Sequence, residues 1–342
     1  MILRSDFSVG WRCAMYKKNY RPKRKKPKRK RHGFPEWLGQ RLLKVLALLL
    51  TATLLCAGLL YALPPSLFMV EPEDIKLNLT NGLPSNCLNV LLLGTDELRD
   101  GVQRSDAIII ASIGYGRFRL TSLMRDTQVD IPGHGRYKLN AAFAFGGPEL
   151  MMRTVNQNFG LNIMHYAQVD YVALVRIVDA LGGVELDITD KERGRINTVI
   201  KSLGRVFIPL GYTAHELMVY GENTHLDGLQ ALTYARLRKD LGDDFARTSR
   251  QRTLIAAIVR KVRDNMWNLP LLKRIWDEVL QSVKTNMSAL QILSLAEKVL
   301  LAVECQQLRL PLPGTYDEQN SRFVITDPDA NREAFMQLVY GK

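Results

Sequence analysis

Three short apolar runs, close together in the chain, limit the folds that this sequence can adopt. They are NVLLLGTD at 89–96, DAIIIASI at 106–113 and FRLTSLM at 118–124. All are rich in Val, Ile and Leu, and the first two are continuously apolar over most of their length, which is typical of strands covered on both faces. We therefore expect these runs to form the middle of a sheet that lies between helices.

Segments with helical signals follow the three runs. One has Gly147 and Pro148 at its start and Gly160 at its end, and the next has Asp170 as N-cap and Gly182 as stop. The run VELDI reads as a further strand. The sequence thus predicts α/β architecture with a sheet between helical layers, because strands and helices alternate without internal repeats. The strand is expected at 184–188 and the later helices at 227–238, 246–266 and 288–303.

The first 63 residues hold a basic segment followed by a charge-free one. They contain 15 of the 47 Lys and Arg but two of the 34 Asp and Glu, which leaves 32 of each sign in the remainder. The run 17–31 is too charged and too poor in apolar residues to fold alone, so we expect 1–40 to be a disordered basic tail. The 19 charge-free residues 45–63 approach the roughly 20 that span a bilayer, so we expect a transmembrane helix at 41–63.

Charge also predicts the orientation of this helix. Arg41 and Lys44 flank its start, and basic residues beside a span stay in the cytoplasm. We expect a single-pass protein of the cell membrane with a cytoplasmic N-terminus, an extracytoplasmic linker at 64–86 and an extracytoplasmic domain at 87–342. A cleaved signal peptide and a lipoprotein signal at Cys56 are alternatives. The long basic region disfavours the first, and the bulky Leu55 disfavours the second.

The basic tail and the cysteines leave two further alternatives. Nucleic-acid or lipid binding would explain the tail, but its place beside the span explains it as a topology determinant, so we expect no nucleic-acid partner. Cys87 and Cys305 are the two cysteines expected outside the membrane, and the sequence leaves open whether they pair.

Charged residues stand where the expected strands begin or end. Asp96 ends the first run, Asp106 opens the second and Arg125 follows the third. In open α/β sheets, ligands bind at strand ends because side chains there leave the core. Two carboxylates and a guanidinium suit a divalent cation beside a phosphate, since carboxylates hold hard cations and Arg binds phosphate as a fork. Solvated ion pairs are the alternative interpretation.

A second basic set lies in the C-terminal half. Arg236 and Arg238 follow a helical segment, and both can reach one ligand only if that helix ends near them. Arg247, Arg250 and Gln251 are spaced i, i+3 and i+4, which predicts two guanidiniums and an amide on one face of a first helical turn.

These motifs resemble the LytR-CpsA-Psr proteins of bacterial cell envelopes. The matching text runs in the family's order from about residue 89 to 263 and includes LLLGTD, RSD, MRDT, YARLR and DFARTSRQR. The resemblance implies an α-β-α sandwich with a central mixed sheet and a hydrophobic tunnel for a lipid. It also implies an extracytoplasmic phosphotransferase in cell wall assembly, which moves a glycopolymer from a polyprenyl-pyrophosphate carrier onto a peptidoglycan hydroxyl through a phosphodiester.

The resemblance assigns roles to single residues as well. It implies Mg²⁺ as cofactor, held by Asp96 and Asp106, and it makes Asp96, Arg125 and Arg238 catalytic. It implies that pyrophosphate is bound by Arg125, Arg236, Arg238, Arg247 and Gln251. Ala246 stands where the family often has Gly, and the variable stretch KDLGDD leaves the match open between Asp243 and Asp244.

Two interpretations remain open at this point. The apolar segments 174–181 and 254–259 are candidates for the tunnel lining, although apolar helix faces more often form core. A non-catalytic sensor or regulator that binds the pyrophosphate lipid or an anionic wall polymer is the alternative function, but a pure binder has no need of two metal-holding acids.

Overall fold

The computed structural model describes residues 77–341, apart from 81, 85, 97–103, 239–243 and 303. These residues all belong to one unit, 64–342. The basic tail, the expected transmembrane helix and most of the linker lie outside the described residues. No helix within the described ranges is long and apolar enough to cross a bilayer.

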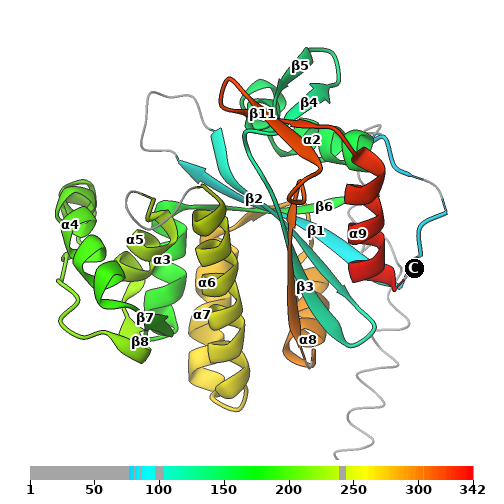
Figure 1. Ribbon diagram of the computed structural model, residues 1–342. Helices are drawn as coiled ribbons and strands as arrows, with labels where there is room; N and C mark the ends of the chain where they lie inside the picture. Colours follow the sequence, from blue (N-terminus) through cyan, green and yellow to red (C-terminus); the bar gives the residue numbers. More distant parts are fainter. Residues whose placement is uncertain are drawn as a thin grey trace, which may run out of the picture. The chain divides into compact units, whose positions relative to one another are not determined.

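A six-stranded mixed sheet lies at the centre of this unit (Figure 1). Its order is β10-β3-β2-β1-β6-β9, so the three apolar runs of the sequence form adjacent strands. β1 and β3 are both antiparallel to β2, whereas β6 is parallel to β1 and β10 is parallel to β3. The predicted α/β class with a central mixed sheet is confirmed. The strands are β1 (Cys87–Asp96), β2 (Arg104–Gly114), β3 (Arg117–Leu123), β6 (His165–Asp170), β9 (Lys284–Thr285) and β10 (Cys305–Leu310).

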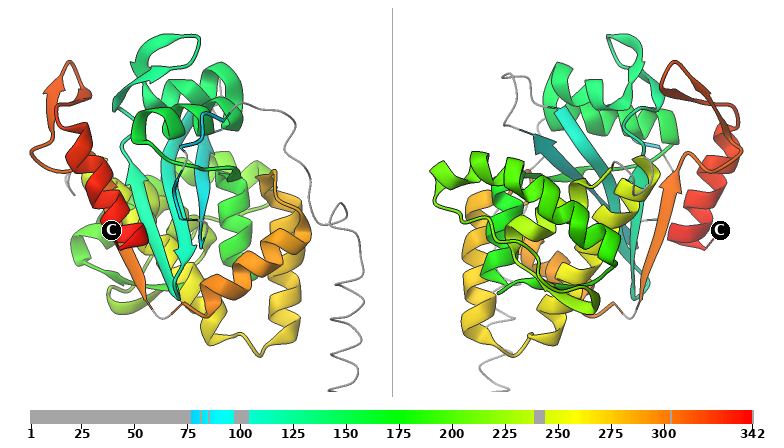
Figure 2. Two further views of the ribbon diagram at one scale, coloured as in Figure 1. Left: turned by 90° about the vertical axis from the view of Figure 1, so that its right-hand side faces the viewer. Right: turned by 60° about the vertical axis from the view of Figure 1, so that its left-hand side comes forward.

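Helices cover both faces of the sheet (Figure 2). Ile108 and Ile110 pack in one core cluster with α2 (Leu139–Phe159) and α9 (Pro328–Tyr340). Ile109 packs in another cluster, against α6 (Asp244–Asp264) and α8 (Ala289–Leu300). Successive residues of β2 are therefore buried on opposite faces, which is why its sequence is apolar without alternation.

A further group of elements packs beside α6. It contains the expected strand at 184–188, which pairs with a second short strand rather than joining the central sheet. Two small hairpins complete the unit. The elements of the group are α3 (Tyr171–Ala180), β7 (Val184–Ile188), α4 (Asp190–Phe207), η2 (Ile208–Leu210), β8 (Gly221–Leu226), α5 (Gly228–Arg236) and α7 (Leu269–Ser282), and the hairpins are β4 (Gln128–Ile131) with β5 (Gly135–Lys138) and β11 (Tyr316–Gln319) with β12 (Arg322–Ile325).

The predicted helix starts are correct for three helices. The Asp170 side chain caps α3 by accepting a hydrogen bond from the Ala173 amide at 2.7 Å. Asp227 and Ser288 cap α5 and α8, each within a capping box completed by a Gln three residues later. These caps fix where each helix begins, and the cap at Asp170 places Tyr171 at the first position of α3.

The sequence predicted only the second part of α2. The predicted start at Gly147 and Pro148 is where the helix resumes after a kink, whereas α2 as a whole begins earlier, at Leu139. Gly146 and Gly147 leave the helical region there, with Gly147 at φ 63°, and Pro148 has no amide hydrogen to donate. The Gly-Gly-Pro signal therefore marks an interruption inside a longer helix.

Cys87 and Cys305, whose pairing the sequence left open, are free thiols. Cys87 lies buried at the start of β1, and burial raises the pKa of its thiol to about 11, so it stays protonated.

The contact between α3 and α5 offers a stability test, because Gly228 begins α5 directly against α3. A methyl group at Gly228 would overlap the Val175 carbonyl oxygen and lie 2.9 Å from Asp179 Oδ1. Gly228→Ala should lower the free energy of unfolding by about 1–3 kcal/mol through overpacking. Gly194→Ala, on α4 with open space around it, should be neutral or slightly stabilising. Thermal unfolding of both variants measures the difference, and equal stabilities would contradict this packing.

Candidate functional site

One edge of the central sheet brings three chain segments together. β1 ends, β2 begins and β3 ends at this edge, because neighbouring strands run antiparallel. Asp96 lies opposite Arg104 in the β1–β2 register, just after an irregularity at Gly94 and Thr95. The strand-end residues of the sequence therefore lie at a common edge.

A cavity of about 1300 Å³ opens at this edge; we term it the main cavity. All seven residues to which the resemblance assigned a role line it. Its lining includes seven basic and four acidic side chains, so its charge favours an anionic ligand. The nominated residues are Asp96, Asp106, Arg125, Arg236, Arg238, Arg247 and Gln251.

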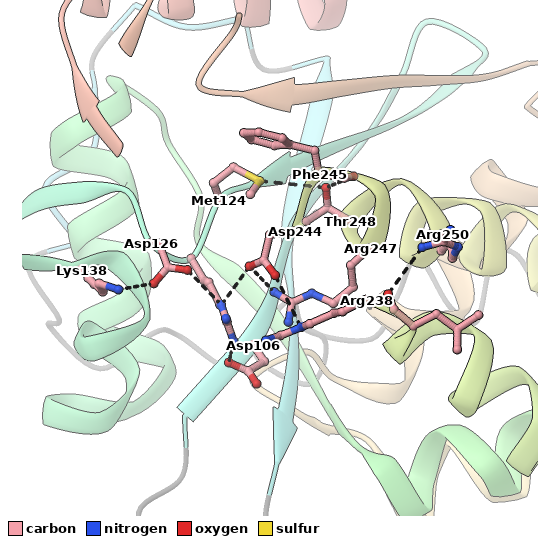
Figure 3. Close-up of polar contacts among 12 residues, drawn as sticks. Asp106, Met124, Asp126, Lys138, Arg238, Asp244, Phe245, Arg247, Thr248 and Arg250 are labelled. Carbon is pink, nitrogen blue, oxygen red and sulfur yellow. Dashed lines mark hydrogen bonds and ion pairs between the residues drawn. The ribbon is translucent and has the colours of Figure 1, made fainter. Parts of the chain in front are cut away.

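Arg125 is held in a network of carboxylates (Figure 3). Its Nη1 donates to Asp106 Oδ1 at 2.7 Å, and its Nε lies 3.2 Å from both Asp126 Oδ2 and Asp244 Oδ2. Burial acts to lower the pKa of the Arg125 guanidinium, but these three carboxylates outweigh it and the pKa is raised. The charge is therefore permanent, and its position is fixed from three sides.

Asp244, at the start of α6, joins three guanidiniums. It pairs with Arg125, with Arg238 at 3.4 Å and with Arg247 at 2.8 Å. Figure 3 shows Arg238 and Arg247 directed toward this carboxylate from one side. Of the two acids between which the sequence could not decide, Asp244 thus lies at the site, and Asp243 lies outside the described residues.

Helix α5 ends near Arg236 and Arg238, as the sequence required if both arginines were to reach one ligand. The helix ends at Arg236, and Leu237 is extended, so Arg236 and Arg238 both line the main cavity. The Arg236 guanidinium carbon lies 4.2 Å from the centroid of the Tyr171 ring. Burial raises the pKa of Tyr171 to about 12, with Arg236 opposing the rise and Asp96 and Asp106 adding to it. The negative charges of Asp96 and Asp106 therefore both influence the Tyr171 hydroxyl.

The first turns of α6 differ in part from the prediction. Arg247 and Gln251 line the main cavity, but Arg250 instead pairs with Glu192 of α4 at 3.0 Å. Two polar atoms of the lining residues, Arg247 Nε and Gln251 Oε1, are buried and lack a hydrogen-bond partner among the described residues. Buried polar atoms are normally satisfied, so these two are candidates for ligand contacts.

Asp96 and Asp106 fit the metal role that the resemblance implied. Mg²⁺ is usually held by one or two carboxylates together with substrate phosphates and water. Two carboxylates in a cavity lined by six arginines match that donor set. No cluster of three or more His, Cys, Asp or Glu in the described part of the chain has the geometry of a protein-only metal site.

Most of the remaining lining of the main cavity is apolar. Leu174 and Ile177 come from the candidate segment 174–181, and Leu254, Ile255 and Ile258 come from 254–259. Several of these side chains also pack against core clusters. The two segments therefore contribute both to the core and to the lining of the cavity, which the sequence analysis had treated as alternatives. The same cavity thus has a charged end at the strand edge and an apolar region between α3, α6 and the sheet.

Several polar or aromatic lining residues were given no role from the sequence. Asp126 accepts from Lys138 Nζ at 2.6 Å, and Tyr171 packs under Arg236. Arg322 comes from the β11–β12 hairpin, about 200 residues after Arg125. The adjacency of Asp126 to Arg125 was a usable signal, whereas nothing local in the sequence marks Arg322, because its place depends on long-range docking.

Comparisons with known proteins match this chain to one protein family and to relatives of known name. A family model described as the LytR_cpsA_psr family matches residues 70–336. The regulatory protein MsrR of Staphylococcus aureus (strain COL) is 28% identical over 257 residues, covering 73% of this chain and 72% of MsrR. The polyisoprenyl-teichoic acid–peptidoglycan teichoic acid transferase TagU of Enterococcus faecalis (strain ATCC 700802 / V583) is 36% identical over 222 residues, covering 62% of this chain and 65% of TagU.

A solved structure is similar in fold. It is the LytR-CPS2A-psr family protein YwtF (TagT) with bound octaprenyl pyrophosphate lipid, with a TM-score of 0.56 and 23% identity. The alignment covers 80% of this chain and 95% of that chain.

The contacts of Asp244 predict that its charge balances the guanidiniums around it. Asp244→Asn should lower the free energy of unfolding by about 1–3 kcal/mol, because Arg125, Arg238 and Arg247 then repel one another. Inorganic pyrophosphate should raise the melting temperature of this variant more than that of wild type, since an anion replaces the missing charge. Asp264→Asn, at the other end of α6, serves as the control. Absence of any pyrophosphate effect in either protein would contradict an anion site here.

Proposed function

The chain belongs to the LytR_cpsA_psr family, and we propose that it is a phosphotransferase that moves a glycopolymer from a polyprenyl-pyrophosphate carrier onto a hydroxyl of peptidoglycan. One observation supports this most: a single cavity combines converging guanidiniums with an apolar region. A polyprenyl pyrophosphate has the same two parts, a doubly phosphorylated head and a long apolar chain. The names of TagU and of lipid-bound TagT agree with such a substrate.

In this proposal, the arginines bind and orient the pyrophosphate. Arg125, Arg236, Arg238 and Arg247 neutralise the two phosphates and the charge that develops on their oxygens in the transition state. Gln251 and the unpaired Arg247 Nε supply further polar contacts to the head group. Because carboxylates and protein packing fix the arginines beforehand, little reorganisation is needed when the ligand binds.

The transfer itself exchanges one phosphorus–oxygen bond for another. The acceptor hydroxyl oxygen bonds to the phosphorus that carries the glycan, and the bond from that phosphorus to the bridging oxygen breaks. The electron pair leaves with polyprenyl phosphate, and the hydroxyl proton passes to a carboxylate of the site, for which Asp96, catalytic by the family resemblance, is the candidate. A divalent cation such as Mg²⁺, when bound by Asp96 and Asp106, would withdraw charge from the phosphate oxygens.

We also propose that the protein is anchored in the membrane. A lipid-linked donor remains in the membrane, and the apolar, charge-free run at 45–63 would anchor the enzyme beside it. The basic residues before that run favour a cytoplasmic tail and an extracytoplasmic catalytic domain, which is where peptidoglycan lies.

A regulatory function is the second candidate, because the relative MsrR is named a regulatory protein. A non-catalytic sensor would bind the same pyrophosphate lipid through the same arginines without cleaving it. Magnesium-dependent release of polyprenyl phosphate separates the two functions, since a sensor leaves the carrier intact.

The clamp formed by the arginines can be tested by removing its most constrained member. Arg125→Ala should slow transfer by a factor of about 10²–10³, the cost of one lost electrostatic contact to the transition state. The measurement uses the full-length chain with a polyprenyl-pyrophosphate saccharide, Mg²⁺ and peptidoglycan fragments. Arg260→Ala, which removes an exposed guanidinium from the same protein outside the cavity, is the control. Full activity of a folded Arg125→Ala variant would refute this assignment.

The apolar region predicts a dependence on lipid length. Ile177→Trp places a larger side chain in the lining between α3 and α6. It should raise the KM for a donor with a long prenyl chain several-fold and leave a donor with two or three isoprene units nearly unaffected, because only the long chain needs that space. Equal effects on both donors, with an unchanged melting temperature, would place the prenyl chain elsewhere.

A further inference from the structure

A second cavity of about 290 Å³ adjoins the main cavity. Arg125 and Asp126 line both cavities, whereas Phe245, Glu318 and Phe323 line the second alone. We propose that this second cavity binds the sugar ring of the acceptor, the one whose hydroxyl attacks the phosphate held by Arg125. This inference rests on the proposed function and adds to it the place where the acceptor binds.

The charges of the two cavities are opposite. The main cavity has an excess of basic side chains, whereas the second contains one guanidinium, Arg125, and three carboxylates, those of Asp126, Asp244 and Glu318. Such a lining repels a second phosphate group. It suits a ligand rich in neutral hydroxyls, because each hydroxyl can donate a hydrogen bond to a carboxylate oxygen. The three acids do not form a metal site, since no such cluster exists in the described ranges.

The aromatic wall of the second cavity suits the apolar face of a sugar ring. Phe323 packs against two rings, with its centroid 5.4 Å from that of Phe245 and 5.0 Å from that of Tyr316. Arg309 lies over the Phe245 ring, 3.9 Å from its centroid. The wall is therefore rigid before a ligand arrives. The volume of the second cavity lies near the lower end of the about 300–1,000 Å³ typical of ligand pockets. A cavity of this size accommodates one sugar ring rather than a prenyl chain.

The position of the second cavity matches the direction of attack. In phosphoryl transfer, the attacking and leaving oxygens lie roughly in line on opposite sides of the phosphorus. The leaving polyprenyl phosphate lies in the main cavity, so the acceptor must approach from another side of Arg125. In Figure 3, Asp244 lies between Phe245 on one side and Asp106 on the other. Of these two neighbours, Phe245 lines only the second cavity and Asp106 lines only the main cavity. A hydroxyl presented from the second cavity meets Arg125 from that side.

The β11–β12 hairpin, which lines the second cavity, is hydrogen-bonded to the segment that follows Arg125. The Phe323 amide donates to the Asp126 carbonyl oxygen at 3.0 Å, and Phe323 forms a bridge with Thr127. The β11–β12 hairpin is thereby held beside Arg125, although it comes from the opposite end of the domain. Its tip carries Glu318 and Ser321 into the second cavity and Arg322 into the main one.

The experiment compares transfer to the acceptor with hydrolysis of the donor. The full-length chain is incubated with a polyprenyl-pyrophosphate saccharide and Mg²⁺, with or without peptidoglycan fragments, and both products are measured. Glu318→Gln should raise the KM for the fragments about tenfold, the loss of one hydrogen bond to a charged group. Phe323→Ala should raise it further. In both variants the ratio of transfer to hydrolysis should fall.

Gln319→Ala is the matched control, because Gln319 is exposed on the same hairpin and lines neither cavity. Glu318 is also exposed, so its variant keeps the test valid if Phe323→Ala fails to fold. An unchanged ratio of transfer to hydrolysis in Glu318→Gln overturns the inference and leaves the proposed function standing. A raised KM for the donor, with that for the acceptor unchanged, also overturns it, since the cavity then binds the donor glycan. A wild-type protein that neither transfers nor hydrolyses refutes the proposed function and this inference together.

Discussion

The balance between clustered guanidiniums and the carboxylates beside them governs the rest of this site. Arginines do not lose their charge in proteins, so a group of them can be held in one cavity only if nearby acids offset their repulsion. Asp244 does this for Arg125, Arg238 and Arg247, while Asp106 and Asp126 add two more contacts to Arg125. The carboxylates offset this repulsion in the ligand-free state, and a bound pyrophosphate would take over part of their role.

The fold supplies the positions that this balance requires. Antiparallel pairing brings the end of β1, the beginning of β2 and the end of β3 to one edge, which places Asp96, Asp106 and Arg125 together. Helices α5 and α6 add Arg236 at an end and Arg247 at a beginning, close to the same edge. The apolar faces of α3 and α6 continue the cavity away from the charges. A head group and a lipid chain can thus be bound by one continuous surface.

The sequence predicted local features well and distant contacts poorly. Asp170, Asp227 and Ser288 each accept a hydrogen bond from a backbone amide within the first turn of the helix. The helix starts could therefore be predicted from neighbouring residues alone. Strand ends also marked Asp96 and Arg125, because a charge after an apolar run must leave the core.

The pairing of Arg250 with Glu192 was missed for a different reason. It depends on packing between segments far apart in the chain, and helical spacing alone could not show that Arg250 reaches α4. The same holds for the β11–β12 hairpin, whose docking on Asp126 brings Arg322 to the main cavity and Glu318 and Phe323 to the second.

The proposed function requires that this cavity breaks a pyrophosphate and passes its glycan to peptidoglycan. The most direct measurement is the stoichiometry of the wild-type reaction, with polyprenyl phosphate and glycan-bearing peptidoglycan fragments quantified by mass spectrometry from one incubation. We expect one polyprenyl phosphate for each glycan joined through a phosphodiester, with neither product formed when Mg²⁺ is chelated. A carrier that binds tightly but remains intact beside an authentic acceptor would contradict the claim and identify the protein as a receptor for the lipid.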